Sequence, residues 1–378
     1  MKVSGDWLDQ DGVQAVLGAL TAAGHQALVV GGCVRNAVLG AAVADVDVAT
    51  DAVPQTVTNI AENAGFRAIP TGIDHGTVTV LAHGVTVEVT TFRRDVETDG
   101  RRAVVAFSAD IAEDAMRRDF TMNALYARAD GTVVDPLGGL PDLLVRRVRF
   151  VGDAGARIRE DYLRILRFFR FQAWYGADGI DADGLAACAA NIAGLETLSR
   201  ERVGAEMRKL LAAPDPAPAV AAMAQAGVMG AILPGTDARW LPVLVHLEGA
   251  MPPRWQRRLA VLGGPDATEA LRLSREDSSV LGHIRDVLQG DHTLAATGFL
   301  YGQVVAQDAC LVRAAMLETA PPDNWLAEIA CGATATFPVS AADLLPALQG
   351  AALGARLKEL QARWLQFDLR LTRAELLG

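Results

Sequence analysis

The stretch VVGGCVRNAVLGAAVADVDVAT, residues 29–50, places a pair of glycines and a pair of aspartates in an otherwise largely apolar run. A hydrophobic segment ends at Gly31 and Gly32, and residues that favour a helix follow from Cys33. Glycine lets the backbone approach a ligand closely, and a helix N-terminus presents free N–H groups at the positive end of its dipole. Arg35 adds a positive charge one turn later. The stretch predicts a strand, turn and helix suited to phosphate, although such turns more often serve chain geometry alone.

The glycine turn matches neither of two common nucleotide-binding patterns. It lacks the GxGxxG spacing of a Rossmann fingerprint and the GK[ST] ending of a P-loop. A nicotinamide-dependent oxidoreductase is therefore disfavoured.

Asp45 and Asp47 lie in the run DVDVA, residues 45–49, which has the composition of a strand. Residues two apart on a strand point to the same face, so we expect the two carboxylates to project together. Carboxylates held together repel unless a cation lies between them. A solvated strand edge would explain the pair equally well in isolation. Together with the glycine turn, the pair predicts Mg²⁺ that bridges the aspartates to phosphate groups.

Glu88 is the lone acid in the β-branched run VTVEVTTF, residues 85–92. One interpretation is a glutamate that faces solvent from the surface of a strand. If that strand lies beside the aspartates, however, Glu88 becomes a third carboxylate of the metal site.

The length and composition of the chain exclude several classes of protein. A chain of 378 residues, of which 51% are hydrophobic, predicts a globular protein with two or more domains. No apolar run is long enough to cross a bilayer, and the acidic start does not fit a signal peptide, so we expect a cytoplasmic protein. The four cysteines are scattered and indicate neither a disulfide framework nor a thiolate metal site.

The net charge of −10 argues against broad, sequence-blind attraction to nucleic acid. The segment from Arg146 to Arg170 differs from the rest, because it holds eight arginines and only three acidic residues. We expect a phosphate-rich ligand to bind in or beside this segment.

Strand-like and helical runs alternate over the first 150 residues, and helical spacing prevails afterwards. The sequence AHG, residues 82–84, reads as a hairpin turn. The proline-bearing stretch 214–218 indicates a further boundary. The expected strands cover 26–30, 45–49, 77–82, 85–92, 103–107 and 132–135, and the expected helices 9–23, 33–39, 54–64, 111–117 and, more briefly, 119–127. The pattern predicts one domain with a partly antiparallel sheet, followed by an all-α region.

Five motifs resemble those of class II tRNA nucleotidyltransferases and bacterial poly(A) polymerases in order and approximate spacing. The resemblance is strong over the first 210 residues and loose in the tail. One departure is Asn36, since the family usually has aspartate after the arginine. The motifs are GGCVRN followed by DVD, RRDFTMNAL (117–125), DPLGGLPDL (135–143), EDYLRILRFFRF (160–171) and SRERVGAE (199–206).

The resemblance implies an α+β fold. Residues 1–150 would form a catalytic, polymerase-beta-like nucleotidyltransferase head with a mixed or antiparallel sheet. Residues 151–213 would form an all-α neck that selects the nucleotide, and residues 214–378 a helical body and tail that hold the tRNA acceptor arm. The charged stretch 95–110 matches the loop that family members use between C addition and A addition.

Asp161 and Arg164 are three apart in an expected helix and would be neighbours on one face. Together they offer an acceptor beside a donor, which matches the edges of adenine and cytosine but not those of guanine and uracil. A surface salt bridge is the alternative. The resemblance assigns these positions to the choice of ATP and CTP without a template. It further implies nucleotide contacts for Arg118, Asp119, Arg167 and Arg170, with Asp119 at the ribose hydroxyls.

These observations predict an enzyme that adds C, C and A to tRNA 3′ ends from CTP and ATP. Two Mg²⁺ ions would bind Asp45 and Asp47, with Glu88 as a further catalytic carboxylate, and the Gly31–Gly32 turn with Arg35 would hold phosphate. An A-only or CC-only enzyme, a poly(A) polymerase and a non-catalytic RNA-binding protein are the alternatives. The sequence indicates no membrane and no dedicated protein partner.

Overall fold

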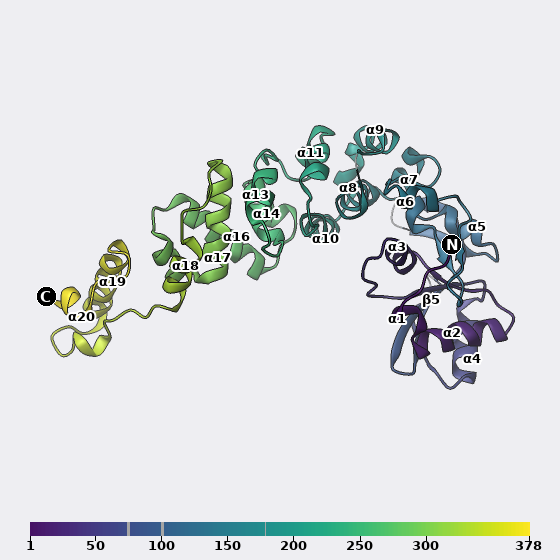
Figure 1. Cartoon of the computed structure of the whole chain (residues 1–378), viewed down its shortest axis with the longest axis horizontal. Coiled ribbons are helices and arrows are strands. Elements are labelled where there is room, and N and C mark those ends of the chain that lie inside the picture. Colours follow the sequence, from purple (N-terminus) through teal and green to yellow (C-terminus); the bar gives the residue numbers. More distant parts are fainter. Residues whose placement is uncertain (74–75, 100–101, 178) are drawn as a thin grey trace. The chain divides into compact units, whose positions relative to one another are not determined.

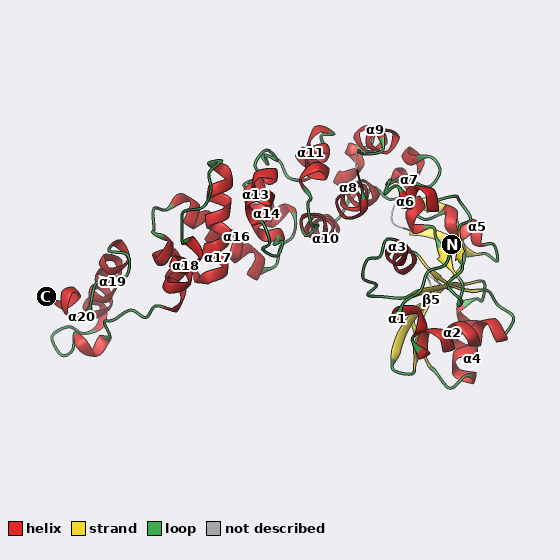
Figure 2. Cartoon of the chain, in the orientation of Figure 1, coloured by secondary structure: helices red, strands yellow, loops and turns green. Residues whose placement is uncertain are grey.

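The computed structural model describes residues 1–73, 76–99, 102–177 and 179–378 (Figure 1). It divides into two compact units, one of Met1–Leu198 with Ala226–Val228 and one of Ser199–Gln225 with Met229–Gly378. The strands of the described residues all belong to the first unit, and the second is helical (Figure 2). The boundaries expected at residues 150 and 213 do not coincide with this division and stay predictions.

A seven-stranded mixed sheet organises the first unit, in the order β3-β4-β5-β2-β1-β8-β9. β2 and β5 run parallel, whereas the other pairs in this sheet are antiparallel. The strands are β1 (Ala27–Val30), β2 (Asp47–Thr50), β3 (Arg67–Gly72), β4 (Thr77–Ala82), β5 (Val85–Thr91), β8 (Tyr126–Ala127) and β9 (Val133–Val134). This arrangement confirms the expected α+β class with a partly antiparallel sheet.

The β4–β5 hairpin shows why the sheet forms where it does. Its turn is His83–Gly84, and both residues have positive φ, 49° and 80°, as the favoured two-residue hairpin turns require. On both strands every second residue is buried, including Val80 and Val87, which are register partners. The helices α2 (Asp11–Ala22) and α4 (Pro54–Asn63) pack against these strands. The hairpin expected at residues 82–84 is confirmed.

A separate antiparallel pair, β6 (Arg93–Asp99) and β7 (Arg102–Phe107), occupies most of the charged stretch 95–110. Gly100 and Arg101 of that stretch lie outside the described residues. The family role expected for this stretch therefore stays a prediction.

Several element boundaries differ from those expected. The strand predicted from residue 45 begins only at Asp47, and the helix predicted at 119–127 is a 3-10 turn, η2 (Thr121–Asn123), that leads into β8. The edge strand β3 was not predicted. The other helices of the unit are α1 (Asp6–Asp9), α3 (Gly32–Val38), α5 (Ile111–Met116), α6 (Leu140–Leu144), α7 (Ala154–Glu160), α8 (Leu163–Tyr175), α9 (Ala182–Ala190) and the 3-10 helix η3 (Ile192–Thr197).

The second unit confirms the expected all-α region. Its longest helix, α17, has a break at Gly302, where φ is 79°. None of the helices in the described ranges combines the length and the apolar character needed to cross a membrane. The helices are α10 (Arg200–Leu211), α11 (Ala217–Gln225), α12 (Val228–Ile232, whose first residue belongs to the first unit), α13 (Leu241–Glu248), α14 (Trp255–Leu262), α15 (Ala267–Ala270), α16 (Arg275–Gln289), α17 (Leu294–Met316), α18 (Trp325–Thr334), η4 (Ala341–Asp343), α19 (Gly350–Gln366) and α20 (Arg373–Leu377).

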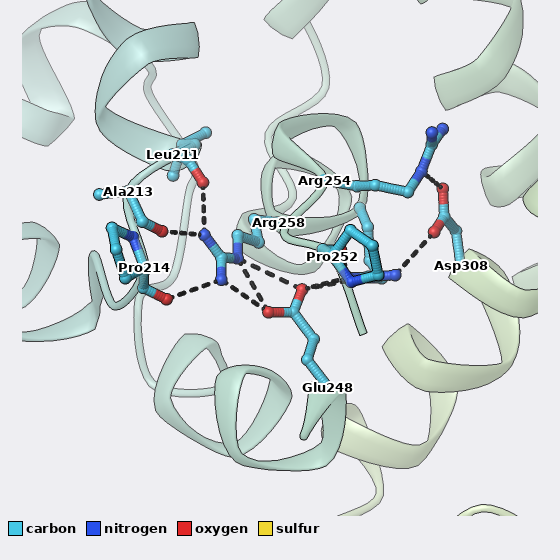
Figure 3. A network of polar contacts seen from close by, with 9 residues as sticks. Leu211, Ala213, Pro214, Glu248, Pro252, Arg254, Arg258 and Asp308 are labelled. Atoms are coloured by element: carbon cyan, nitrogen blue, oxygen red, sulfur yellow. Dashed lines mark hydrogen bonds and ion pairs between the residues drawn. The ribbon is translucent and has the colours of Figure 1, made fainter. Parts of the chain in front are cut away.

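A buried network of charges ties the helices of this unit together (Figure 3). Glu248, at the end of α13, accepts hydrogen bonds from Arg257 and Arg258 of α14. Arg258 also donates to the carbonyl oxygens of Leu211, the last residue of α10, and of Ala213 and Pro214, which follow it (Figure 3). Arg257 reaches Asp308 of α17 at 3.1 Å. The network thus joins α10, α13, α14 and α17.

Candidate active site

The parallel pairing of β2 with β5 brings two of the predicted carboxylates together. Asp47 is the first residue of β2, and its register partner across the ladder is Glu88 of β5. The condition set for Glu88, that its strand lies beside the aspartates, is therefore met. Asp45 is exposed and precedes the strand, so the expectation that it lies within the strand was wrong. The strand starts later because residues 41–46 have no ladder partner.

The electrostatics of Asp47 indicate a site that favours a cation. Asp47 is exposed at the start of the strand, yet the protein packed around its carboxyl raises the pKa of that group, and the charge of Glu88 raises it further, with Asp45 adding in the same direction and Arg118 opposing. A carboxylate whose pKa is raised by neighbouring negative charges gains from a positive ion beside it. Carboxylate oxygens are the ligands that Mg²⁺ prefers, and one or two of them suffice where phosphates supply the rest. These residues fit the predicted ion, although no three His, Cys, Asp or Glu side chains in the described ranges form a group that could hold a metal.

The glycine turn lies at the same end of the sheet. β1 pairs antiparallel with β2, with Val29 opposite Val48, so the turn after β1 adjoins the start of β2. Cys33, in the first turn of α3, lies close to Asp47 at the start of β2. Burial, together with a smaller effect of the Asp47 charge, raises the pKa of the Cys33 thiol to about 11. The turn and the strand-borne aspartate are thus neighbours, as the sequence predicted.

Gly31 adopts a backbone conformation that requires glycine, with φ of 74°. A Cβ atom at this position would lie 3.4 Å from Nη1 of Arg118, so the guanidinium lies against the turn. Arg118 is fixed there by Asp114, at 2.9 Å, and by the hydroxyl of Tyr126, at 3.1 Å. The structure therefore brings Gly31, Arg118 and Asp47 into one place.

Arg35 is buried behind the turn and does not simply project into solvent. It donates to the side-chain oxygens of Asn123, at 2.5 Å, and Asn36, at 2.9 Å, and to the Tyr175 hydroxyl, at 2.8 Å. None of its hydrogen-bond partners within the described ranges is a carboxylate. Burial accordingly lowers the pKa of the guanidinium, despite the opposing effects of Tyr175 and Asp119.

Asp119 is buried and forms an ion pair with Arg167 of α8, in which the Arg167 Nε lies 2.7 Å from the carboxylate. Its other oxygen accepts from the backbone of Phe120 and from the amide of Asn123. Burial alone would raise the pKa of this carboxyl, but Arg167 and Asn123 outweigh it and hold the pKa below its ordinary value. The predicted contact of Asp119 with ribose hydroxyls would have to share oxygens that already accept protein donors, and it stays a prediction.

Asp161 and Arg164 do not lie on one helix, so that part of the prediction was wrong. α7 ends at Glu160, and Asp161 has extended dihedral angles, φ −153° and ψ 103°. The Asp161 carboxylate accepts from the N–H of Leu163 at the start of α8, and an acidic side chain that takes such an N–H interrupts a helix. The two residues stay close, because the Arg164 N–H donates to the Asp161 carbonyl at 2.9 Å.

Glu160 is a residue of this region that the sequence reasoning missed. It accepts from Nη1 of Arg164 at 2.6 Å and forms an ion pair with Arg157. Arg164 also donates to the carbonyl oxygens of Arg157 and Arg117. The spacing of Glu160 four residues before Arg164 was the available signal. These contacts hold the Arg164 guanidinium in one orientation.

A strand pair that presents carboxylates beside a glycine turn, followed by an arginine-rich helix, defines a nucleotidyltransferase head. Residues 27–149 match the poly A polymerase head domain, and residues 179–239 match a probable RNA- and SrmB-binding site of polymerase A. The CCA-adding enzyme of Geobacillus thermodenitrificans is 37% identical over 281 residues, which cover 72% of this chain and 67% of that protein. The chain belongs to the family of CCA-adding tRNA nucleotidyltransferases and bacterial poly(A) polymerases.

Other relatives show how much of the chain is similar to known proteins. A mitochondrial CCA tRNA nucleotidyltransferase of Danio rerio is 45% identical over 48% of this chain and 43% of its own length. The chain thus matches about half the length of several relatives. The crystal structure of the Bacillus stearothermophilus CCA-adding enzyme in complex with CTP superimposes with a TM-score of 0.77 at 29% identity, covering 94% of this chain and 93% of that one.

Proposed function

We propose that this chain adds C, C and A to the 3′ end of tRNA, from CTP and ATP and without a template, and releases pyrophosphate. The observation that carries the proposal is the register of Asp47 with Glu88 beside the glycine turn, in the same unit as the arginines of α8. Relatives named as CCA-adding enzymes, one of them solved with CTP, support the substrate class. The RNA-binding match supports tRNA as the acceptor. We expect the reaction to take place in the cytoplasm.

The residues of the head would divide the chemistry between them. Asp45 and Asp47, with Glu88, would hold two Mg²⁺ ions, which when bound lower the pKa of the terminal 3′-hydroxyl and neutralise charge on the triphosphate. The N–H groups of the Gly31–Gly32 turn would take phosphate oxygens. Arg35, behind the turn, and Arg118, against it, would orient the triphosphate for in-line attack of the hydroxyl on the α-phosphorus.

The neck would choose the base. Asp161 and Arg164 offer an acceptor and a donor from neighbouring positions at the break between α7 and α8. Because Glu160 and two carbonyl oxygens fix the Arg164 guanidinium, it would act as a rigid template for the edges shared by cytosine and adenine. Arg167 and Arg170 would contact the nucleotide from the next turns of α8.

The test is stepwise incubation of the full chain with tRNAs that lack the last three, two or one nucleotides. CTP alone should extend the first tRNA by two residues, ATP alone should extend only the last, and both together should complete all three. Intact tRNA is the control and should not be extended. A long run of A would indicate a poly(A) polymerase, and extension of only the last tRNA would indicate an A-adding enzyme. Product that stops after the two C residues with both nucleotides present would indicate a CC-adding enzyme.

A further inference from the structure

A chain of hydrogen bonds, closed into a ring by helix α8 itself, joins that helix to Arg35, which follows the glycine turn. The Tyr175 hydroxyl accepts from Arg35 at 2.8 Å, and Arg35 donates onward to the Asn123 side-chain oxygen at 2.5 Å. The Asn123 amide then donates to Asp119 at 2.9 Å, and Asp119 accepts from Arg167 at 2.7 Å. The ring closes because Arg167 and Tyr175 belong to the same helix.

Phe171 packs against three members of this ring, Arg35, Arg167 and Tyr175. It lies midway between Arg167 and Tyr175 at intervals of four residues, so the three side chains share one face of α8. The guanidinium carbons of Arg35 and Arg167 lie 5.2 Å and 5.4 Å from the Phe171 ring centroid, within reach of a cation–π attraction. Arg35 also stacks on the Tyr175 ring at 3.9 Å. Because the Phe171 side chain packs against both guanidinium groups, the residues of the hydrogen-bonded ring have little freedom to move.

Each side of the ring belongs to a different part of the proposed reaction. Arg35 follows the turn that would take the triphosphate, whereas Arg167 lies on the helix whose first turn would read the base. Asn123 and Tyr175 have no expected contact with the nucleotide. They connect the two sides, since Asn123 uses its oxygen for Arg35 and its amide for Asp119.

We propose that Tyr175 and Asn123 are positioning residues for nucleotidyl transfer, which hold the phosphate-binding turn and the base-reading helix at a fixed separation. The inference rests on the proposed function. Base recognition on α8 can place the α-phosphorus beside the carboxylates of β2 only if this separation is constant. Loosening the ring would therefore harm both the rate and the choice of nucleotide.

The test compares Tyr175→Phe, Asn123→Ala and the double variant with the wild type, in steady-state assays of the full chain on tRNA that lacks CCA. Tyr175→Phe keeps the aromatic ring and removes only the hydroxyl. Since a hydrogen bond to a charged group is lost, kcat/KM for CTP should fall about tenfold or more. The preference for CTP over UTP should fall with it. Asn59→Ala, an exposed asparagine of α4 in the same unit, is the control and should change neither quantity.

The two variants should not combine independently, because each opens the same ring. The double variant should be little worse than the more impaired single variant. If kcat fell equally for every nucleotide while KM and the CTP to UTP preference stayed unchanged, Tyr175 and Asn123 would only stabilise the fold. That result would overturn the inference. Wild-type preference in Tyr175→Phe would do the same even if Asn123→Ala failed to fold. A wild type that incorporates neither CTP nor ATP would instead contradict the proposed function itself.

Discussion

Replacing Arg258 with methionine should destabilise the helical unit by about 3–5 kcal/mol, the range for removing one partner of a buried ion pair. Arg258 is only 2% exposed, and its Nη2 lies 2.7 Å from Glu248. It also donates to the carbonyl oxygens of Leu211, the last residue of α10, at 2.8 Å, and of Pro214, at 3.0 Å (Figure 3). The substitution would remove all of these bonds at once.

The magnitude follows from what each neighbour loses. Each buried carbonyl left without a donor costs about 1–3 kcal/mol, and those of Leu211 and Ala213 lose one, whereas the exposed Pro214 carbonyl can bind water instead. Burial of the methionine side chain returns about 1.5–3 kcal/mol. Glu248 keeps a second partner, because Arg257 Nε donates to it at 2.8 Å, so its charge is not left alone. Taken at mid-range, about 4 kcal/mol for the two carbonyls and about 2 kcal/mol for the lost charged bond to Glu248, against about 2 kcal/mol returned, leave a loss of about 4 kcal/mol.

Urea unfolding, followed by tryptophan fluorescence, would measure the change. Four of the six tryptophans lie in the helical unit, at positions 240, 255, 325 and 364, so the signal reports mainly on that unit. Arg272→Met is the matched control. Its side chain is 65% exposed and lies 3.5 Å from Glu201, so the loss should be about 1 kcal/mol or less. A loss for Arg258→Met no larger than that of the control would refute the assigned role of the network.

Two further predictions concern the head and the neck. Glu88→Gln should move the acid limb of the single-turnover pH profile to lower pH, because the Glu88 charge helps to raise the pKa of Asp47, which must be ionised to bind a cation. An unmoved limb would show that the two carboxyls do not interact. Arg164→Ala should increase misincorporation of UTP and GTP, measured by primer extension of tRNA that lacks CCA. Unchanged rejection of these nucleotides would place base selection elsewhere.

The sequence was most informative where local chemistry determines local structure. The glycine turn, the hairpin at His83–Gly84 and the alternation of β4 and β5 follow from turn geometry and side-chain period, so each could be predicted. β3 could not, because its proline is typical of an edge strand and its residues lack a clear alternation. The break at Asp161 was missed because one carboxylate competes with an otherwise regular helical pattern.

In the candidate site, too, the contacts between residues distant in the sequence were the ones that could not be predicted. Asp47 and Glu88 could be paired only conditionally, since 41 positions separate them and the crossover between parallel strands leaves no local signal. The bond between Arg35 and Tyr175 spans 140 positions and could not be predicted from spacing. Sequence reasoning gave Arg35 a role toward phosphate alone, whereas packing against α8 gives it a second role in the ring.

We propose that the carboxylates at the start of β2 hold the ions that nucleotide transfer requires. The measurement that decides this is the single-turnover rate of CTP incorporation by Asp47→Ala, with Mg²⁺ and a tRNA that lacks CCA. The rate should fall about a thousandfold or more, while the affinity for tRNA stays unchanged. Asp9→Ala, an exposed acid of the same unit, should match the wild type. Substantial turnover by Asp47→Ala, with tRNA binding intact, would show that nucleotide transfer does not depend on this carboxylate.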